Sequence, residues 1–405
     1  MQNSSQRSRR NLKIISLNGT IGKRDKRTIL RRDKLTEKIF TKKDLTEMWE
    51  RPVERQYNIA LTKMMRCIND TMGDITLCVS GGKDSTLLAD MYCELIAQSP
   101  YKDIPVKLAF ANTTNETSAI LKFVYEFNDY LKEKYGVNID FQEIRPPKNI
   151  TWAKFILENG LPLISKAQAK AIRYIKRDMA KTGCDYETVL KYANQTMKSV
   201  NELRDIGFSD SGILSLTGYA TSKDKFGKCF MVSKIWLPMA NCEENLTEQC
   251  CVKIKEAALK SLPSKNVMTG EQASESKMRE EAYMKTGCNI RLPNGEYKSK
   301  PFGAMTKDGI LFALKYRGTP ICSDYGEIVK DENGCFRCTK AQRTGCALCG
   351  FGCQYDTERF VRLQETEPAK VNFAFKPKSE GGAGYKEAIE YMNEYCGTKV
   401  VIPKI

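Results

Sequence analysis

Hydrophobic residues between positions 75 and 144 follow two alternating spacings. A short apolar run at 75–79 precedes a turn rich in glycine and serine, and apolar residues then recur at helical spacing as far as Gln98. The same order returns at 106–131, and a third apolar run at 137–144 is followed by two prolines. Strands that alternate with helices predict an α/β fold with a doubly wound, mostly parallel sheet.

The pattern outside this unit is mostly helical. Further helices are expected at 44–69, 152–163, 166–179, 181–215 and 385–395, and an alternating stretch predicts a hairpin at 218–236. We divide the chain into a basic arm at 1–43, an α/β domain at 44–330 with an insertion around 165–245, a cysteine-rich segment at 331–365 and a tail at 366–405.

The composition is that of a soluble globular protein, with 41% hydrophobic and 28% charged residues. No apolar run approaches the roughly 20 residues of a membrane span, and the polar N-terminus does not resemble a signal peptide, so we expect a cytoplasmic protein that does not contact membranes. Histidine is absent, which excludes Ser-His-Asp and Cys-His catalysis and mixed Cys/His zinc sites. Sixteen cysteines without an export signal indicate a reducing compartment, where thiolate ligands are favoured over disulfides.

The net charge of +16 is concentrated at the N-terminus. Residues 1–43 contain fourteen Lys and Arg against three acidic residues, a net charge of +11. Such an arm can bind nucleic acid through phosphate contacts, or it can be a solvated tail, and the sequence leaves both readings open.

The turn after the first predicted strand has the chemistry of an anion site. It reads Ser80-Gly81-Gly82-Lys83-Asp84-Ser85 and leads directly into a helix. Glycines let a ligand approach the backbone, and free N–H groups with the helix dipole favour negative charge. Because the carboxyl ends of parallel strands meet at one edge of the sheet, we expect residues 112–117, after the second strand, to face the same pocket.

The cysteines form two groups. Cys250 and Cys251 are adjacent, and five more cysteines follow within nineteen residues, at Cys335, Cys338, Cys346, Cys349 and Cys353. Two Cys-x-x-Cys pairs are a strong metal signal, and Cys335, Cys338, Cys346 and Cys349 would suit a four-thiolate zinc site. We favour a [4Fe–4S] cluster held by Cys250, Cys251, Cys346 and Cys349. Adjacent helical side chains diverge, which suits two irons better than one zinc ion, and the remaining thiols would support the cluster or form a second site.

Five motifs in order make the chain, over roughly residues 70–365, resemble the phosphoadenylylsulfate (PAPS) reductase family of PP-loop enzymes. SGGKDST at 80–86 is similar to the phosphate loop, and FANTTNET at 110–117 resembles the nucleotide-side motif. The segment 269–279 is similar to a third motif, 301–328 to a fourth, and CCVKIK with CALC resembles the split cluster ligands of adenylylsulfate reductases. Residues 350–363 resemble a subgroup common in phages and low-GC Gram-positive bacteria.

The resemblance implies a PP-loop, Rossmann-like fold and a set of site residues. Nucleotide contacts would come from Ser80, Gly81, Gly82, Lys83, Asp84, Ser85, Asn112, Thr113, Glu116, Gly270, Glu275 and Ser276. Catalytic roles would go to Lys83, Asp84 and Arg279, with ATP or an adenylylated sulfate, (P)APS, as the nucleotide and Mg²⁺ as the counter-ion. Two departures stand out. Gln272 replaces the usual arginine of the third motif, and the family's C-terminal cysteine stretch is reduced to Tyr395-Cys396-Gly397.

Three functions remain open at this point. The first is adenylate-dependent sulfur transfer by an ATP pyrophosphatase, with a nucleic acid as the acceptor suggested by the basic arm and with a sulfur-donor protein as partner. The second is true (adenylyl)sulfate reduction that releases sulfite, with a reductant protein as partner. The third is a nucleic-acid-binding protein that contains a nucleotide and a metal but performs no catalysis.

Overall fold

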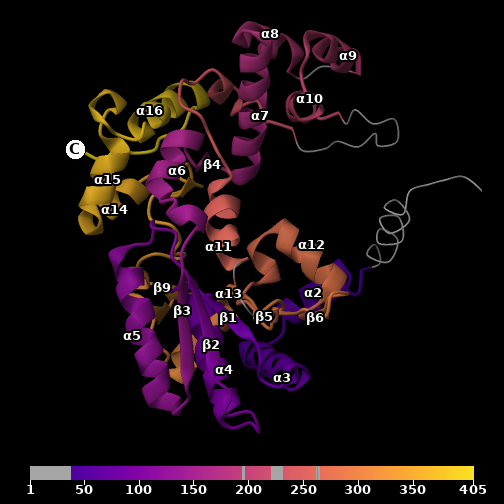
Figure 1. The fold of residues 1–405 in the computed structure, drawn as a ribbon, viewed down its shortest axis with the longest axis vertical. Helices are drawn as coiled ribbons and strands as arrows, with labels where there is room; N and C mark the ends of the chain where they lie inside the picture. Colours follow the sequence, from indigo (N-terminus) through magenta and orange to yellow (C-terminus); the bar gives the residue numbers. More distant parts are fainter. Residues whose placement is uncertain (1–37, 194–196, 220–230, 261, 263–264) are drawn as a thin grey trace, which may run out of the picture.

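The computed structural model describes residues 38–405 except 194–196, 220–230, 261 and 263–264. The chain forms two lobes (Figure 1), one built on a sheet and the other mostly helical. The sheet lobe contains the early part of the chain together with residues around 265–340, and the second lobe combines the middle of the chain with its C-terminal end.

The main sheet has six strands in the order β3-β2-β1-β5-β7-β6, and every neighbouring pair is parallel except β6 with β7. The strands are β1 Thr76–Val79, β2 Val106–Ala111, β3 Ile139–Ile144, β5 Val267–Met268, β6 Asn289–Arg291 and β7 Tyr297–Ser299. The predicted α/β class with a mostly parallel sheet is therefore confirmed. From β1 the chain adds β2 and β3 on one side and later β5 on the other, so the topological switch point lies between β1 and β5.

Helices pack around this sheet, and those before residue 136 lie in regions where the apolar spacing predicts helix. They are α2 Lys42–Trp49, α3 Val53–Thr71, α4 Lys83–Ala97, α5 Ser118–Tyr135, α12 Lys277–Thr286 and α13 Lys307–Arg317. The single helix expected at 44–69 is wrong in one respect, because the chain forms two helices with Pro52 between them as the residue before α3. Proline lacks an amide hydrogen and is tolerated at the start of a helix but not in its interior.

The second lobe has a hydrophobic core of its own, shared by two distant parts of the chain. Its first part contains α6 Trp152–Asn159, β4 Leu163–Ile164, α7 Lys166–Thr182, α8 Tyr186–Tyr192, α9 Met197–Ile206, α10 Asp210–Thr217 and a π-helical turn at Cys251–Glu256. This turn continues into α11 Ala257–Leu259, which contacts β2 of the main sheet. The core's second part contains β10 Gly350–Phe351, α14 Arg359–Thr366, α15 Pro368–Phe375 and α16 Tyr385–Cys396. A parallel pair of strands, β4 with β10, joins the two parts.

This second core places the C-terminal residues against the middle of the chain. Phe360, Phe375 and Tyr385 are buried and pack on one another with ring centroids 5.0–5.7 Å apart. The same core contains Ile172 of α7. The domain boundaries drawn from the sequence stay a prediction, but the stretch called a tail contributes to this core.

The hairpin expected at 218–236 falls largely on residues 220–230, which lie outside the described part of the chain. Its described flanks contain no strand. No helix within the described ranges is long and apolar enough to cross a membrane.

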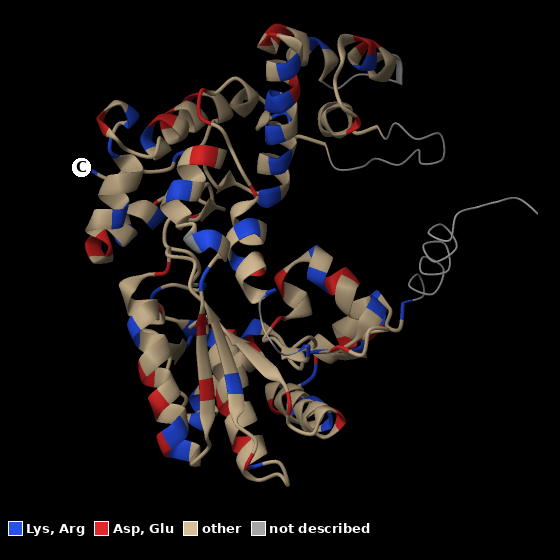
Figure 2. Ribbon diagram, viewed as in Figure 1, with Lys and Arg blue, Asp and Glu red and all other residues tan. Residues whose placement is uncertain are grey.

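The basic helix α7 is visible in Figure 2 as a series of blue bands along its length. Some of these basic side chains form ion pairs and hydrogen bonds with other residues of the second lobe. Arg173 contacts Glu248 at 2.6 Å, and Lys176 donates to the carbonyl of Glu244 at 3.0 Å. The basic N-terminal arm lies almost entirely outside the described residues, so nucleic-acid binding by the arm stays a prediction.

Candidate functional site

The turn at residues 80–85 follows β1 and opens α4, as the sequence predicts. The Ser80 amide donates to Ser85 Oγ at 3.0 Å, and Ser85 Oγ donates to the carbonyl of Gly82 at 2.9 Å. Ser80 Oγ lies 3.2 Å from Ser85 Oγ. Within the described part of the chain, no hydrogen bond uses the amides of Gly81 and Gly82. The two serines therefore brace the turn and leave backbone donors free at a helix N-terminus, where they favour an anion.

Two glycines in and near the turn have no room for a side chain. Gly81 has a φ of +68°, and a Cβ atom there would lie 3.0–3.1 Å from Ile120 and Val124 of α5. A Cβ atom on Gly270, which follows β5, would lie 2.8 Å from the carbonyl oxygen of Asp84. Gly270 thus packs directly on the start of α4, at the switch point between β1 and β5.

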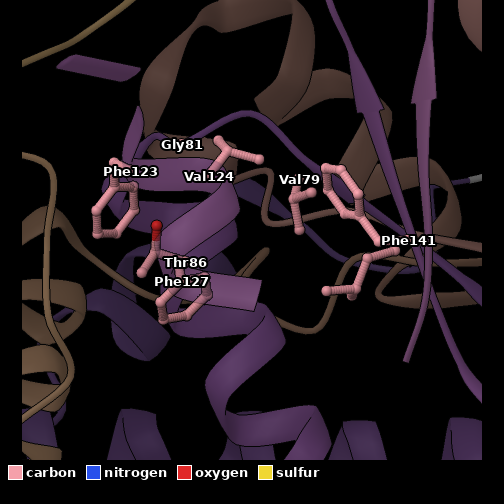
Figure 3. Close-up of a pocket in the computed structure, with 8 residues that line it drawn as sticks. Val79, Gly81, Thr86, Phe123, Val124, Phe127 and Phe141 are labelled. Atoms are coloured by element: carbon pink, nitrogen blue, oxygen red, sulfur yellow. The ribbon is translucent and has the colours of Figure 1, made fainter. Parts of the chain in front are cut away.

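Behind the turn lies a small cavity with apolar walls (Figure 3). Phe123, Thr86 and Phe127 lie together at one end of the view, and Val79 lies toward Phe141 at the other. No charged side chain lines it, so this cavity belongs to the packing of α4 against α5 and is unsuited to phosphate.

Lys83 and Asp84 are bound to each other and to the third motif. The Lys83 side chain is almost fully buried, and its Nζ lies 3.1 Å from Asp84 Oδ2. The other carboxylate oxygen, Asp84 Oδ1, accepts a hydrogen bond from Gln272 Nε2 at 2.5 Å. Gln272, the residue that departs from the family's arginine, therefore acts as a neutral support of the turn.

Tyr325 is a site residue that the sequence did not single out, although its segment was matched to a motif. Its phenol oxygen accepts the Lys83 amide at 3.1 Å and lies 2.7 Å from Thr344 Oγ1. The residue is 2% exposed. Tyr325 thus connects the first amide of α4 to the segment that leads to Cys346.

The residues after β2 lie beside the turn but are mostly bonded among themselves. Glu116 accepts from the Thr113 amide at 2.9 Å and from the Thr113 hydroxyl at 2.7 Å. Asn112 donates to Glu143 of β3 at 3.1 Å. Hydrogen bonds from Tyr125, Arg145 and Asn112 outweigh burial, which opposes ionisation, and keep the pKa of Glu143 below its usual value.

The segment 269–279, the third motif, has some residues that contact the turn and others on the surface of α12. Ser276 caps α12 by accepting the Arg279 amide at 3.3 Å, and Arg279 pairs with Glu275 one helical turn away. Its guanidinium also lies 3.9 Å from Glu271. Arg279 and Gln272 line one small cavity, so Gln272 is the link between this ion-pair cluster and the turn.

A polar cavity of about 50 Å³ lies between the turn and Cys346. Ser80 and Glu116 line it from the sheet lobe, and Thr344, Gly345 and Cys346 line it from the segment after β9 (Phe336–Cys338). Lys255, from the π-helical turn, lines the same cavity. Sequence reasoning missed Lys255, although its place four residues after Cys251 puts both on one face of a helical turn.

Four cysteines expected to act together do lie together. Electrostatic interactions join Cys250 to Cys251, Cys346 and Cys349. The Cys250 thiol donates a hydrogen bond to Cys251, and this bond together with burial raises the pKa of Cys250. The same hydrogen bond and the charge of Lys166 lower the pKa of Cys251 against the effect of burial. Burial raises the pKa of Cys346 to about 12.

The metal predicted at these cysteines is not supported by their arrangement. In the described ranges, no group of three or more His, Cys, Asp or Glu side chains is arranged to hold a metal ion. The four thiols thus share a neighbourhood without forming a ligand shell. The iron–sulfur cluster and the zinc alternative both stay predictions.

Of the other cysteines discussed above, Cys353 interacts electrostatically with Cys349, whereas Cys335, Cys338 and Cys396 belong to other parts of the fold. Cys335 is exposed at the edge of the hairpin formed by β8 (Ile328–Lys330) and β9, whereas Cys338 is buried in the sheet lobe's core. Cys353 and Cys396 are buried in the second core. Burial raises the pKa of Cys396 to about 11, and its neighbour is Cys242.

Comparisons with known proteins add little to this geometry. No protein-family profile matches the chain, and no curated protein sequence matches it. Among solved structures, the chain is similar to the crystal structure of phosphoadenylyl-sulfate (PAPS) reductase from Candida auris in a phosphate complex, with 11% identity and a TM-score of 0.30. The alignment covers 73% of this chain and 98% of that one. A likeness this low carries no argument about function.

Proposed function

We propose that the chain is a PP-loop enzyme that binds an adenine nucleotide, with its phosphates on residues 80–85, and carries out adenylate-dependent sulfur chemistry. The observation that carries the proposal is the polar cavity, because Ser80 of the turn and Cys346 of the thiol group line the same space. A nucleotide held at the turn would thus have its α-phosphorus near a group of thiols.

The residues of the turn and cavity have distinct parts in this proposal. The free amides of Gly81 and Gly82 and the N-terminus of α4 would bind phosphate oxygens. Lys83 and Lys255 would neutralise charge that develops when the bond between the α- and β-phosphates breaks and pyrophosphate leaves. Glu116 lines the cavity and is held in place by Thr113.

The thiols would act after the nucleotide has been cleaved. Adenylation of an acceptor would make AMP a leaving group, and a donor protein's persulfide would transfer its outer sulfur to Cys346. The Cys346 persulfide would then attack the adenylated carbon and expel AMP, which leaves the acceptor joined to Cys346 by a disulfide. A neighbouring thiol of the group would attack Cys346 to release the thiolated acceptor, and a thiol reductant would reduce the protein disulfide that remains. No step of this proposal depends on a metal at the cysteines. The products distinguish the two possible nucleotides, because ATP would yield AMP and pyrophosphate whereas an adenylylated sulfate would yield sulfite.

The test is product analysis with purified, anaerobically prepared protein, Mg-ATP and candidate nucleic acids. We expect AMP and pyrophosphate, and we expect Lys83→Met to abolish both. Lys122→Met is the matched control, because Lys122 lies on the surface of α5 with 76% of its side chain exposed. Tight ATP binding without either product under all conditions would instead support the non-catalytic alternative.

Sulfite release from an adenylylated sulfate is the second candidate function. For this reaction we favour Cys346 over Cys396 as the reacting cysteine, because Cys346 lines the cavity. Cys396 lies in the second core and does not line the cavity. We expect that Cys396→Ser retains any sulfite release measured with a thiol reductant and that Cys346→Ser loses it. An absorption spectrum with iron and sulfide analysis tests the predicted cluster separately, since zinc sites lack the broad visible band.

A further inference from the structure

An open groove lies on the sheet lobe between α13 and the β8–β9 hairpin, and none of the functions above uses it. It has a volume of about 510 Å³ and is lined by Phe312, Lys315, Tyr316, Val329, Lys330 and Phe336. Three aromatic rings and two lysines thus make up nearly all of its walls.

Among the three aromatic rings of the groove, Tyr316 is largely exposed, whereas Phe312 and Phe336 are half-buried. The rings of Phe312 and Tyr316 lie 5.7 Å apart with an angle of 15° between their planes, and Phe336 lies 6.0 Å from Phe312. Tyr316 also meets the ring of Tyr57 edge-on at 6.2 Å, yet 72% of its surface is exposed. Tyr316 is therefore a ring whose orientation is fixed by its neighbours and whose outer surface is free to stack.

The charge at the groove is positive. Lys315 is held at the rim by a hydrogen bond to the carbonyl of Ile328 at 2.8 Å, and Lys330 Nζ lies 5.0 Å from the centre of the Phe336 ring. No carboxylate lines the groove. The nearby Asp308 is instead engaged by the Phe336 amide, at 2.5 Å. The occupant that complements these walls has flat ring faces and negative charge at short intervals.

We propose that this groove binds single-stranded nucleic acid, with a base stacked on Tyr316 and backbone phosphates at Lys315 and Lys330. Single strands expose base faces and phosphates together, whereas a duplex hides its base faces within the stack. An acidic peptide would satisfy the lysines, but it offers no regular series of flat rings. This binding proposal does not depend on the nucleotide chemistry proposed above.

The groove is also connected to the polar cavity through the chain. Residues after β9 run to Thr344, which bonds to Tyr325, and then to Gly345 and Cys346 on the cavity wall. A nucleic-acid strand bound in the groove would therefore contact the β8–β9 hairpin, and the residues that follow this hairpin form one wall of the proposed active site.

Fluorescence anisotropy with full-length protein and labelled oligo(dT) of about fifteen nucleotides tests the proposal. We expect Tyr316→Ala to weaken binding about tenfold or more, because stacking on an aromatic ring is the main contact, and Tyr316→Phe to bind like the wild type. Tyr355→Ala is the matched control, since Tyr355 is 88% exposed and does not line the groove. Lys330→Ala should also reduce the slope of the logarithm of the binding constant against the logarithm of the salt concentration by about 0.7.

The basic arm is the main competing explanation for any binding, and these variants leave its charge unchanged. Cross-linking with a bromouridine-substituted oligonucleotide locates the strand, and we expect the cross-linked peptides to contain residues 312–316 or 336. Equal affinity of Tyr316→Ala and Tyr355→Ala, equal competition by duplex DNA, or cross-links confined to residues 1–37 would each overturn the proposal. Capture of an acidic peptide with no oligonucleotide binding would do the same.

Discussion

The turn that we propose binds phosphate depends on the absence of a side chain at position 81. Gly81 has a φ of +68°, and an added Cβ would lie 3.0 Å from Ile120 Cγ2 and 3.1 Å from Val124 Cγ2. Both neighbours are buried side chains of α5. A methyl group here would therefore strain the backbone and push the turn away from α5 at the same time.

The two effects can be estimated separately. The left-handed conformation costs an alanine about 1–2 kcal/mol relative to glycine, and forcing a methyl group into a packed site costs about 1–3 kcal/mol. We expect Gly81→Ala to lower the free energy of unfolding by about 2–5 kcal/mol. Gly136→Ala is the matched control, because Gly136 has a φ of +64° with no atom within 4 Å of an added Cβ. It should show only the conformational cost.

Urea denaturation of the two variants and the wild type measures the difference in stability, and calorimetric titration with ATP measures the effect on binding. Gly81→Ala should lose more stability than Gly136→Ala and should bind ATP at least about tenfold more weakly, because a displacement on the order of 1 Å is costly at a precise site. Equal losses of stability would show that packing on α5 does not constrain the turn. Unchanged ATP binding by Gly81→Ala would refute its role in holding phosphate.

Three further predictions concern stability and thiol chemistry. Arg317→Met should destabilise the fold by about 1.5–3 kcal/mol in urea denaturation, because the fully buried Asp90 loses the guanidinium 2.5 Å away but keeps Lys134 at 3.2 Å. Adding Lys134→Met should increase this loss, because the buried carboxylate then has neither cation. Burial opposes the ionisation of Glu367, but hydrogen bonds from Lys370 and from the first amide of α5 lower its pKa overall, so the ionised carboxylate stabilises the fold at neutral pH and loses this effect in acid. Glu367→Gln should therefore melt at a lower temperature than the wild type at pH 7, and this difference in melting temperature should disappear as the pH falls below about 4. Brief treatment with iodoacetamide should label Cys335 before the buried cysteines in a peptide map, and earlier labelling of a core cysteine would contradict the structure.

The parts of the fold that the sequence predicts best are those set by local patterns. The strand, turn and helix at 75–98 follow from an apolar run, two glycines and apolar residues at helical spacing, and all three are observed. Tyr325 was missed for the opposite reason. Tyr325 reaches Lys83 from 242 positions away, and such contacts depend on how the sheet brings segments together rather than on any local pattern.

The cysteines show what spacing can and cannot predict. Adjacent Cys250 and Cys251 and the pair at Cys346 and Cys349 were expected to meet, and their side chains do interact. Spacing gives no information about whether four sulfurs point at one centre, and their arrangement does not form a ligand shell. The same limit applies to Arg279, because a motif cannot show that its guanidinium is paired with Glu275.

The proposed site has walls from both lobes, which gives its ligands a distinguishing property. Ser80 follows a strand of the main sheet, whereas Cys346 leads into β10, which pairs with β4 of the second lobe. A nucleotide that fills the cavity from the turn to Cys346 must contact both lobes, whereas inorganic phosphate at the turn contacts only the sheet lobe. A ligand bound to the folded protein slows the local opening of the segments that it contacts. A nucleotide should therefore protect the backbone amides of the turn and of residues 346–351 from hydrogen exchange, whereas phosphate should protect only the amides of the turn. Protection confined to the turn with both ligands would mean that the cavity and the thiols are not part of the nucleotide site.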